Sequence, residues 1–388
     1  MNKLPDWLPH TFAMQTQSIA SLPSWLAAAV CFVLGLAIGS FLNVVIYRIP
    51  RGESIVAPGS RCPGCSAPIG ARDNIPLLSF LILRGRCRRC NQIISPLYPF
   101  VEITCALIFL VIGLFSGLSW YSAAQMWFAA TMLAVMCIDA SHEVIPDEIT
   151  YPSFPLAIAF AALKGGSNAS LLAVGSLITP EELGFSPIRA ALTGTFMLFL
   201  AVPLFWVIDQ LDQVLFSKYL NWKPDDSDNA LSPPESEDSS SSNYGKLLIV
   251  SAVIGAVLAA AWLLLALKLS RQNPENFLEA LNSFYDSLAG IATGGGILWV
   301  IRTIYFYVRG IEGMGLGDVK LMCIIGAFLG WQGAIAVLVV GSVGGLLFGI
   351  YLAFRHKTGL KTRLPLGVFL GIAALLTQLG LILERPAV

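Results

Sequence analysis

The sequence predicts an all-α polytopic membrane protein with about 8–10 transmembrane helices. Two observations support this class. Only 12% of the 388 residues are charged and 56% are hydrophobic, whereas soluble domains have about 25% charged and about 45–50% apolar residues. The apolar residues also fall in runs of roughly 20, the length of a helix that crosses a bilayer core. This excludes a soluble globular protein and a disordered chain, and the net charge of zero predicts no nucleic-acid partner.

Continuous apolar runs define the expected helices. They cover residues 24–46, 97–117, 122–138, 149–164, 188–208, 246–268, 286–308, 319–331, 333–354 and 365–383. Segment 149–164 is borderline in length, and 319–331 spans a bilayer only where the membrane is thin or the protein shields it. The first run follows a segment of mixed polarity and is longer than a signal-peptide core, so we expect it to be retained.

Positive charge predicts the orientation. Residues 47–96 carry eight arginines against Glu53 and Asp73, and basic loops stay in the cytoplasm. The N-terminus is therefore expected outside and residues 47–96 inside. The basic segment 355–364 falls on the same side when the helices are counted forward.

These features divide the chain into five expected regions. They are an N-terminal segment with the first helix (1–46), a cytoplasmic cysteine module (47–96), two or three helices (97–165), an insertion (166–280) and the last helices (281–388). The insertion holds two of the expected helices and the stretch PDDSDNALSPPESEDSSSSN at 224–243. Its acidic, serine-rich composition cannot build a core, so we expect this stretch to be disordered.

Four of the eight cysteines form a zinc-ribbon-like pattern. Cys62 and Cys65 make one C-x2-C pair, and Cys87 and Cys90 make another. Two such tight turns aim four thiolates at one tetrahedral centre, and four thiolates leave no open coordination position. The pattern predicts a structural Zn²⁺ site on the cytoplasmic side, where a disulfide would not persist. A redox or empty cysteine cluster is the alternative.

Two aspartates stand at the ends of apolar helices. Asp139 follows the run TMLAVMCI, and Asp318 follows the glycine-rich run GMGLG. Acids at membrane helices are functional candidates by default. Two adjacent carboxyl groups that share a proton suit aspartic proteolysis, and the three glycines would let a substrate backbone approach. The alternatives are a helix cap for Asp318 and a headgroup contact for Asp139. Asp147 is expected to cap a helix, and Lys320 either tunes the aspartates or marks the interface.

The ordered motifs resemble those of the bacterial type IV prepilin peptidases. They are GSFLNVVIYRIP at 39–50, the two cysteine pairs around NIPLLSF, YPFVE at 98–102, IDASHEVIPDEIT at 138–150 and GMGLGDVKL at 313–321. The family consists of inner-membrane aspartic endopeptidases that are also N-methyltransferases. The resemblance implies that Asp139 and Asp318 are catalytic, at the cytoplasmic face, and that the cysteine module holds zinc.

The resemblance also implies the substrates. These are prepilins or pseudopilins, whose basic leader is removed and whose new N-terminal residue is methylated from S-adenosylmethionine. Asn74, Gly85 and Glu102 are the expected S-adenosylmethionine contacts. The long segment 166–280 departs from the family pattern and is expected to be regulatory, to bind a pilus or type II secretion assembly component, or to be neutral.

Three other functions remain open at this stage. One is a leader peptidase without methyltransferase activity, which an assay of methyl transfer would distinguish. Another is a transporter with a zinc-ribbon module, although its acids should face each other at mid-bilayer and its helices should repeat. A non-catalytic assembly scaffold would not require both aspartates.

Overall fold

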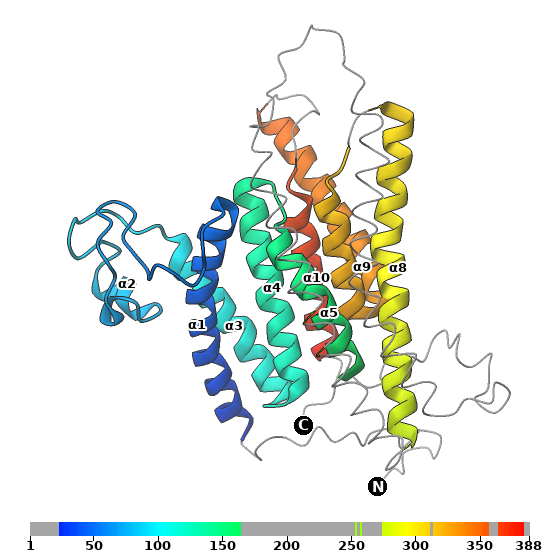
Figure 1. Cartoon of the computed structure of the whole chain (residues 1–388), viewed down its shortest axis with the longest axis horizontal. Helices are drawn as coiled ribbons and strands as arrows, with labels where there is room; N and C mark the ends of the chain where they lie inside the picture. Colours follow the sequence, from blue (N-terminus) through cyan, green and yellow to red (C-terminus); the bar gives the residue numbers. More distant parts are fainter. Residues whose placement is uncertain are drawn as a thin grey trace, which may run out of the picture. The chain divides into compact units, whose positions relative to one another are not determined.

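The computed structural model describes residues 23–163, 274–310, 313–356 and 364–383, with the single residues Val253 and Val257. The helices are α1 (Ser24–Arg48), α2 (Leu78–Ile82), α3 (Leu97–Ser116), α4 (Trp120–His142), α5 (Asp147–Leu163), α8 (Pro274–Arg309), α9 (Leu316–His356) and α10 (Leu366–Leu383). Two 3-10 turns, η1 (Ile49–Arg51) and η2 (Ala71–Asp73), lie between α1 and α2 in the sequence. Figure 1 labels the α-helices. The described residues form no extended strand, which confirms the all-α class.

Six of these helices are long and apolar enough to cross a membrane: α1, α3, α4, α8, α9 and α10. This confirms a multi-pass membrane protein. Of the remaining expected helices, 188–208 lies outside the described residues, as does 246–268 apart from Val253 and Val257. Segment 149–164 forms α5, which has 17 residues and is therefore shorter than each of the six candidate spans.

The expected helices 319–331 and 333–354 both lie in α9, which consists of two helices that meet at a kink, where Gly330 has non-helical backbone angles. Residues 321–330 are all buried, so the first half of α9 is shielded by protein, as its short apolar run requires. Helix α8 is longer than the expected 286–308 because it starts at Pro274. Its first turns include polar residues that an apolar-run criterion leaves out.

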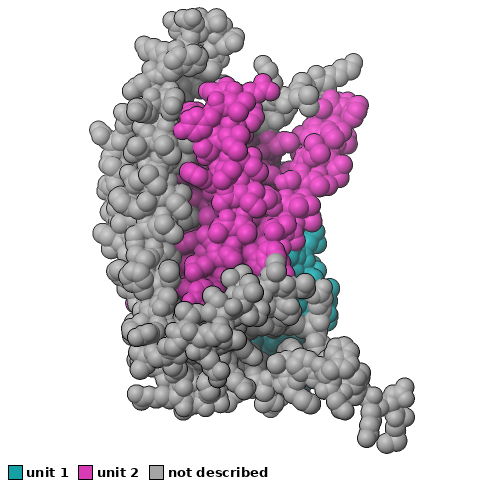
Figure 2. Space-filling model, turned by 90° about the vertical axis from the view of Figure 1, so that its right-hand side faces the viewer, with its two compact units in different colours: residues 1–138, 374–388 teal, residues 139–373 magenta. Residues whose placement is uncertain are grey.

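The described chain divides into two compact units, residues 1–138 with 374–388 and residues 139–373 (Figure 2). In the first unit, α1 packs along α3. A Cβ at Gly35 would lie 2.6 Å from Ala106 Cα, and a Cβ at Gly39 would lie 2.7 Å from Glu102 Cα. Small residues thus bring the two backbones into contact, as is typical of membrane helices.

In the second unit, α8, α9 and α5 pack on one another. The backbones of Gly290 in α8 and Gly326 in α9 are in contact, with no room for a Cβ on either residue. Gly330 has φ 79°, a left-handed conformation that glycine adopts without strain, and it breaks α9 next to the Asp286 carboxylate. This packing holds the N-terminal half of α9, whose first turn contains Asp318.

Candidate functional site

Asp139 lies in the last turn of α4 and is 5% exposed. Its Oδ2 accepts a hydrogen bond from the backbone N–H of Val368 at 3.0 Å. Val368 belongs to the first turn of α10, where backbone N–H groups have no partner within the helix and suit an acidic side chain. The start of α10 therefore orients the carboxyl group of Asp139, across 229 residues of sequence.

Asp318 lies in the first turn of α9. It is close enough to Asp139 for an electrostatic interaction between the two carboxyl groups. The folded chain therefore brings the two aspartates near one another, and their catalytic role stays a prediction. Both residues belong to the same compact unit, residues 139–373.

Ile145 connects the surroundings of the two aspartates. A Cβ on Gly317, the residue before Asp318, would lie 3.0 Å from Ile145 Cβ. A Cβ on Gly367 would lie 3.1 Å from Ile145 Cδ1 and 2.8 Å from Asp139 Oδ2. Gly317 and Gly367 therefore leave the space that Ile145 and the Asp139 carboxyl group occupy. Sequence reasoning missed Ile145 and Gly367, because nothing local marks an isoleucine in a loop or a glycine in an apolar helix.

The three glycines before Asp318 differ in their surroundings. Gly313 packs directly against the Tyr305 ring, and Gly317 packs against Ile145. A Cβ on Gly315 would have only Gly317 N at 3.9 Å and Asp318 Oδ2 at 4.0 Å nearby. Gly315 is therefore the glycine of this run with open space next to the Asp318 carboxyl group.

Arg302 of α8 supports the loop before Asp318. Its side chain is buried, with 4% exposure of the residue, and its Nε donates to the carbonyl oxygen of Met314 at 3.0 Å. A buried arginine is costly unless it is hydrogen-bonded, so this contact fixes the loop between α8 and α9. No sequence motif marked Arg302.

Asp147 and Lys320 also belong to this site. Asp147 is the first residue of α5, and its Oδ1 accepts from Lys320 Nζ at 2.8 Å. The Lys320 side chain is 8% exposed and that of Asp147 is 21% exposed. Lys320 Nζ also lies 5.0 Å from the centre of the Tyr151 ring. Lys320 thus ties the start of α5 to the first turn of α9, two residues after Asp318.

The four cysteines of the module form one cluster. The sulfur atoms of Cys62, Cys65, Cys87 and Cys90 all lie within 4.8 Å of one another, and those of Cys62 and Cys90 are 3.7 Å apart. Tetrahedral zinc with Zn–S bonds of about 2.3 Å separates its sulfurs by about 3.8 Å. The donor set and its spacing therefore fit a four-thiolate metal site.

The two cysteine turns repeat the same backbone. In the first, Cys62 N donates to Ala67 O at 2.9 Å, and in the second, Cys87 N donates to Gln92 O at 2.8 Å. Ser66 and Asn91, at equivalent places, have φ values of 53° and 57°. Each turn is closed by an antiparallel bridge, between residues 61 and 68 and between residues 86 and 93. This repetition aims both cysteine pairs at one point.

Backbone groups also act on the cysteine sulfurs. The N–H groups of Cys90 and Arg89 lower the pKa of Cys87 to about 6. The N–H of Gln92 acts in the same direction on Cys90, but burial and the other thiols outweigh it and raise the pKa of Cys90 to about 12. Four close sulfurs compete for protons in this way, and a divalent cation would displace those protons.

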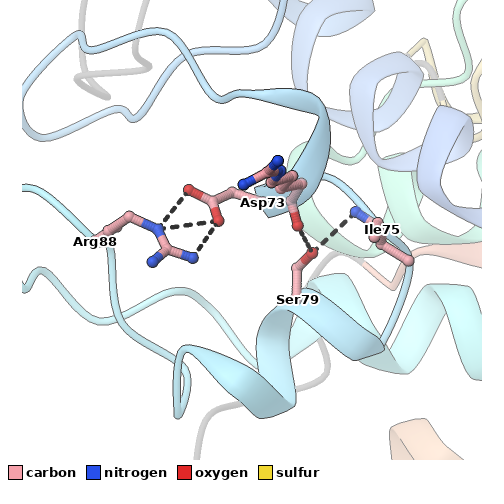
Figure 3. Close-up of polar contacts among 5 residues, drawn as sticks. Asp73, Ile75, Ser79 and Arg88 are labelled. Carbon is pink, nitrogen blue, oxygen red and sulfur yellow. Dashed lines mark hydrogen bonds and ion pairs between the residues drawn. The ribbon is translucent and has the colours of Figure 1, made fainter.

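An ion pair holds the second cysteine turn to the rest of the module (Figure 3). Arg88 Nη2 lies 2.6 Å from Asp73 Oδ1, and Arg88 Nε lies 2.9 Å from Asp73 Oδ2. This two-point contact lowers the pKa of the Asp73 carboxyl group. It connects η2 with the second cysteine pair.

The three expected S-adenosylmethionine contacts surround α2. Asn74 follows η2 and is exposed. Gly85 has φ 69°, and a Cβ there would lie 3.1 Å from the Phe80 ring. Glu102 is 8% exposed, and its Oε2 accepts from Leu77 N at 2.8 Å. The contacts of Gly85 and Glu102 are with other residues of the protein. The binding of S-adenosylmethionine by Asn74, Gly85 and Glu102 stays a prediction.

Two family models match the chain. Residues 33–115 match the bacterial peptidase A24 N-terminal domain, and residues 246–350 match the type IV leader peptidase family. All four clustered cysteines lie in the first match and Asp318 lies in the second, while Asp139 lies between them. The second match begins inside the segment 166–280, whose status as an insertion stays a prediction. No solved structure matches the chain.

Several curated proteins are similar to the chain along most of its length. A prepilin leader peptidase/N-methyltransferase of Stutzerimonas stutzeri is 26% identical over 379 residues, which cover 92% of this chain and 91% of that protein. One of Aeromonas salmonicida is 26% identical, with 90% and 89% covered. One of Myxococcus xanthus is 41% identical over 145 residues, with 37% and 43% covered. The chain is therefore similar, over residues 33–115, to the N-terminal domain of the bacterial A24 peptidases and, over residues 246–350, to the type IV leader peptidases.

Proposed function

We propose that the chain is a membrane aspartic endopeptidase that removes the basic leader of type IV prepilins or pseudopilins. The proximity of Asp139 and Asp318, which are 179 residues apart in sequence and whose neighbours Gly367 and Gly317 both pack against Ile145, is the observation that carries this proposal. The similarity to prepilin leader peptidase/N-methyltransferases supports the substrate class. We place the enzyme in the bacterial inner membrane with its N-terminus outside and its active site at the cytoplasmic face.

The proposed chemistry needs only the two carboxyl groups and a water molecule. The ionised carboxyl group of the pair takes a proton from the water, whose oxygen then attacks the carbonyl carbon of the scissile peptide bond. The protonated partner donates its proton to the carbonyl oxygen as the tetrahedral intermediate forms. When the C–N bond breaks, the carboxyl group that took the water proton gives it to the leaving amine, and its partner takes back a proton from a hydroxyl of the intermediate. The bond from Val368 N–H holds Asp139 in one orientation throughout.

The surroundings of the pair suit an extended basic leader. Gly315 leaves open space next to Asp318, where a substrate backbone would lie. Glu143, which is close enough to Asp139 for an electrostatic interaction, and Glu148, in the first turn of α5, are both exposed and would attract a basic leader. The neighbouring acid Asp147 is instead neutralised by Lys320. We therefore assign leader attraction to Glu143 and Glu148.

We further propose that the enzyme N-methylates the new N-terminal residue, as the names of the relatives imply for those proteins. S-adenosylmethionine would supply the methyl group. Asn74, Gly85 and Glu102 remain the proposed contacts. Cys62, Cys65, Cys87 and Cys90 would hold one structural Zn²⁺, which would fix the fold of the module. We also propose pilus or type II secretion assembly components as further partners.

Cleavage of a model prepilin in membranes tests the peptidase proposal. Asp139→Asn and Asp318→Asn should each lower cleavage by at least about 10²-fold, because asparagine cannot exchange a proton with water or the leaving group. Glu53→Gln is the control, since Glu53 is an exposed acid of the loop after α1. All variants should be compared at equal protein level. Full cleavage by either aspartate variant would contradict the mechanism.

A further inference from the structure

Helix α2 has its polar and apolar faces reversed relative to a helix in water. Its hydroxyl residue Ser79 is 7% exposed, while Leu81 is 69% exposed and Ile82 is 64% exposed. Ser79 Oγ accepts from Ile75 N at 2.9 Å and donates to Arg72 O at 3.0 Å (Figure 3). A helix at a water-exposed surface normally buries its aliphatic side chains and exposes its polar ones. The outer face of α2 therefore suits an apolar environment.

Neighbouring side chains extend this outer face. Leu78, Leu81 and Ile82 are spaced at i, i+3 and i+4, so they share one side of the helix. Leu78 is 49% exposed, and Ile75, three residues before it, is 45% exposed. We refer to Ile75, Leu78, Leu81 and Ile82 as the α2 apolar face. Four exposed aliphatic side chains in eight residues form a continuous patch rather than scattered surface residues.

A hydrogen bond places α2 beside the first turns of a membrane helix. Leu77 N, directly before α2, donates to Glu102 Oε2 at 2.8 Å. Glu102 is the sixth residue of α3, one of the candidate membrane spans. At about 1.5 Å per residue, it lies about 8 Å along that helix from its first residue. The beginning of α2 is therefore level with the start of a span rather than out in the aqueous phase.

Positive charge directly follows this apolar face. Arg84 and Arg86 come two and four residues after α2, and both are exposed. Aliphatic side chains followed by arginines are typical of segments that lie in a membrane interface, where arginine meets lipid phosphates. We infer that α2 is an interfacial anchor: its apolar face inserts among the acyl chains of an anionic bilayer, and Arg84 and Arg86 contact the headgroups.

Photocrosslinking of the full-length protein in nanodiscs tests this anchor. A diazirine-bearing amino acid replaces Leu81 in nanodiscs of phosphatidylcholine and phosphatidylglycerol, and adducts are identified by mass spectrometry. Ser66, an exposed residue of the first cysteine turn, is the matched control position. The anchor predicts lipid adducts several-fold more abundant at 81 than at 66. Equal lipid labelling at the two positions overturns it, as does labelling at 81 of protein (substrate or a second copy) rather than lipid.

The headgroup contact has its own test in the same particles. Replacing both arginines, by Arg84→Gln with Arg86→Gln, should lower the lipid adduct at 81 in anionic nanodiscs. It should have little effect in nanodiscs of phosphatidylcholine alone, because a neutral surface does not attract arginine electrostatically. An equal adduct yield in both lipid compositions, with and without the arginines, would overturn the anionic-lipid part of the inference. None of these outcomes depends on peptidase activity. The anchor can therefore be overturned while the proposed function stands, and the reverse.

Discussion

Lys320 and Asp147 form an ion pair of 2.8 Å although 173 residues separate them in the chain. The pair joins the first turn of α9, which holds Asp318, to the first residue of α5. The loop that leads to Asp147 holds Ile145, which contacts Gly317 and Gly367. The ion pair therefore helps to position the elements that carry the two aspartates.

A double-mutant cycle on this pair should reveal a positioning role. Lys320→Met and Asp147→Asn should each lower kcat by up to about 10²-fold with a small change in KM, because small displacements of reacting groups are costly. Lys320→Arg, which keeps the positive charge, should retain most of the wild-type kcat. The double variant should be no slower than the single ones, because each single variant already removes the ion pair and leaves one of its two charges uncompensated by the other. Independent, multiplicative losses measured by cleavage kinetics would contradict this.

Gly367→Ala should slow leader cleavage by displacing the carboxyl group of Asp139. The added methyl group would lie 2.8 Å from Asp139 Oδ2 and 3.1 Å from Ile145 Cδ1, so one of these groups must move. We expect a loss in kcat of up to about 10²-fold. Gly380→Ala in the same helix is the matched control, because no atom lies within 4 Å of its added Cβ. It should keep full activity, and equal losses in both variants would point to a general effect on α10.

Two substitutions in the glycine run separate substrate access from packing. Gly315→Ala meets no atom closer than 3.9 Å, so the protein should fold normally while cleavage weakens, because the methyl group fills space beside Asp318. Gly313→Ala would collide with the Tyr305 ring and should lower thermal stability instead. Thermal unfolding and cleavage kinetics, measured on both variants, check this division. Normal KM and kcat for Gly315→Ala would remove Gly315 from the substrate path.

Removal of one cysteine should abolish metal binding. Cys90→Ser lacks one of four thiolates and should lose most of its zinc, measured by mass spectrometry of the purified protein. The module should also become more sensitive to proteolysis, because structural zinc contributes directly to folding. Cys31→Ala, which changes a buried cysteine of α1 outside the cluster, should retain its zinc. Equal zinc content in wild type and Cys90→Ser would show that the cluster is not the metal site.

Local sequence patterns predicted the helices and the cysteine cluster. Apolar runs mark helices directly, and the C-x2-C spacing fixes each pair within one turn, so only one long-range contact between the turns remained to form. The apolar-run criterion ended one helix at residue 331 and began the next at 333, on either side of Gln332. In the structure α9 has a kink close to this point, at Gly330, whose backbone angles are non-helical.

The contacts around the aspartates could not be predicted in the same way. The bond from Val368 N to Asp139 and the pair of Lys320 with Asp147 join segments 229 and 173 residues apart. Such contacts depend on which helices pack together, which no local pattern encodes. Asp147 was expected to cap a helix because its local context is a helix start. Its partner Lys320 comes from another helix and is supplied only by the packing of α5 on α9.

Glu102 offers a direct test of whether it positions the chain or binds the methyl donor. Its Oε2 accepts from Leu77 N, and a glutamine side chain keeps an oxygen that can accept the same bond. If Glu102 only holds Leu77, Glu102→Gln should retain methyl transfer and Glu102→Ala should lose much of it. If the carboxylate charge contacts S-adenosylmethionine, both variants should raise the KM for S-adenosylmethionine to a similar extent. Methyl transfer to a cleaved prepilin, measured over a range of S-adenosylmethionine concentrations, separates the two roles. Leader cleavage should continue in both variants, because Glu102 has no part in the proposed proton transfers at Asp139 and Asp318.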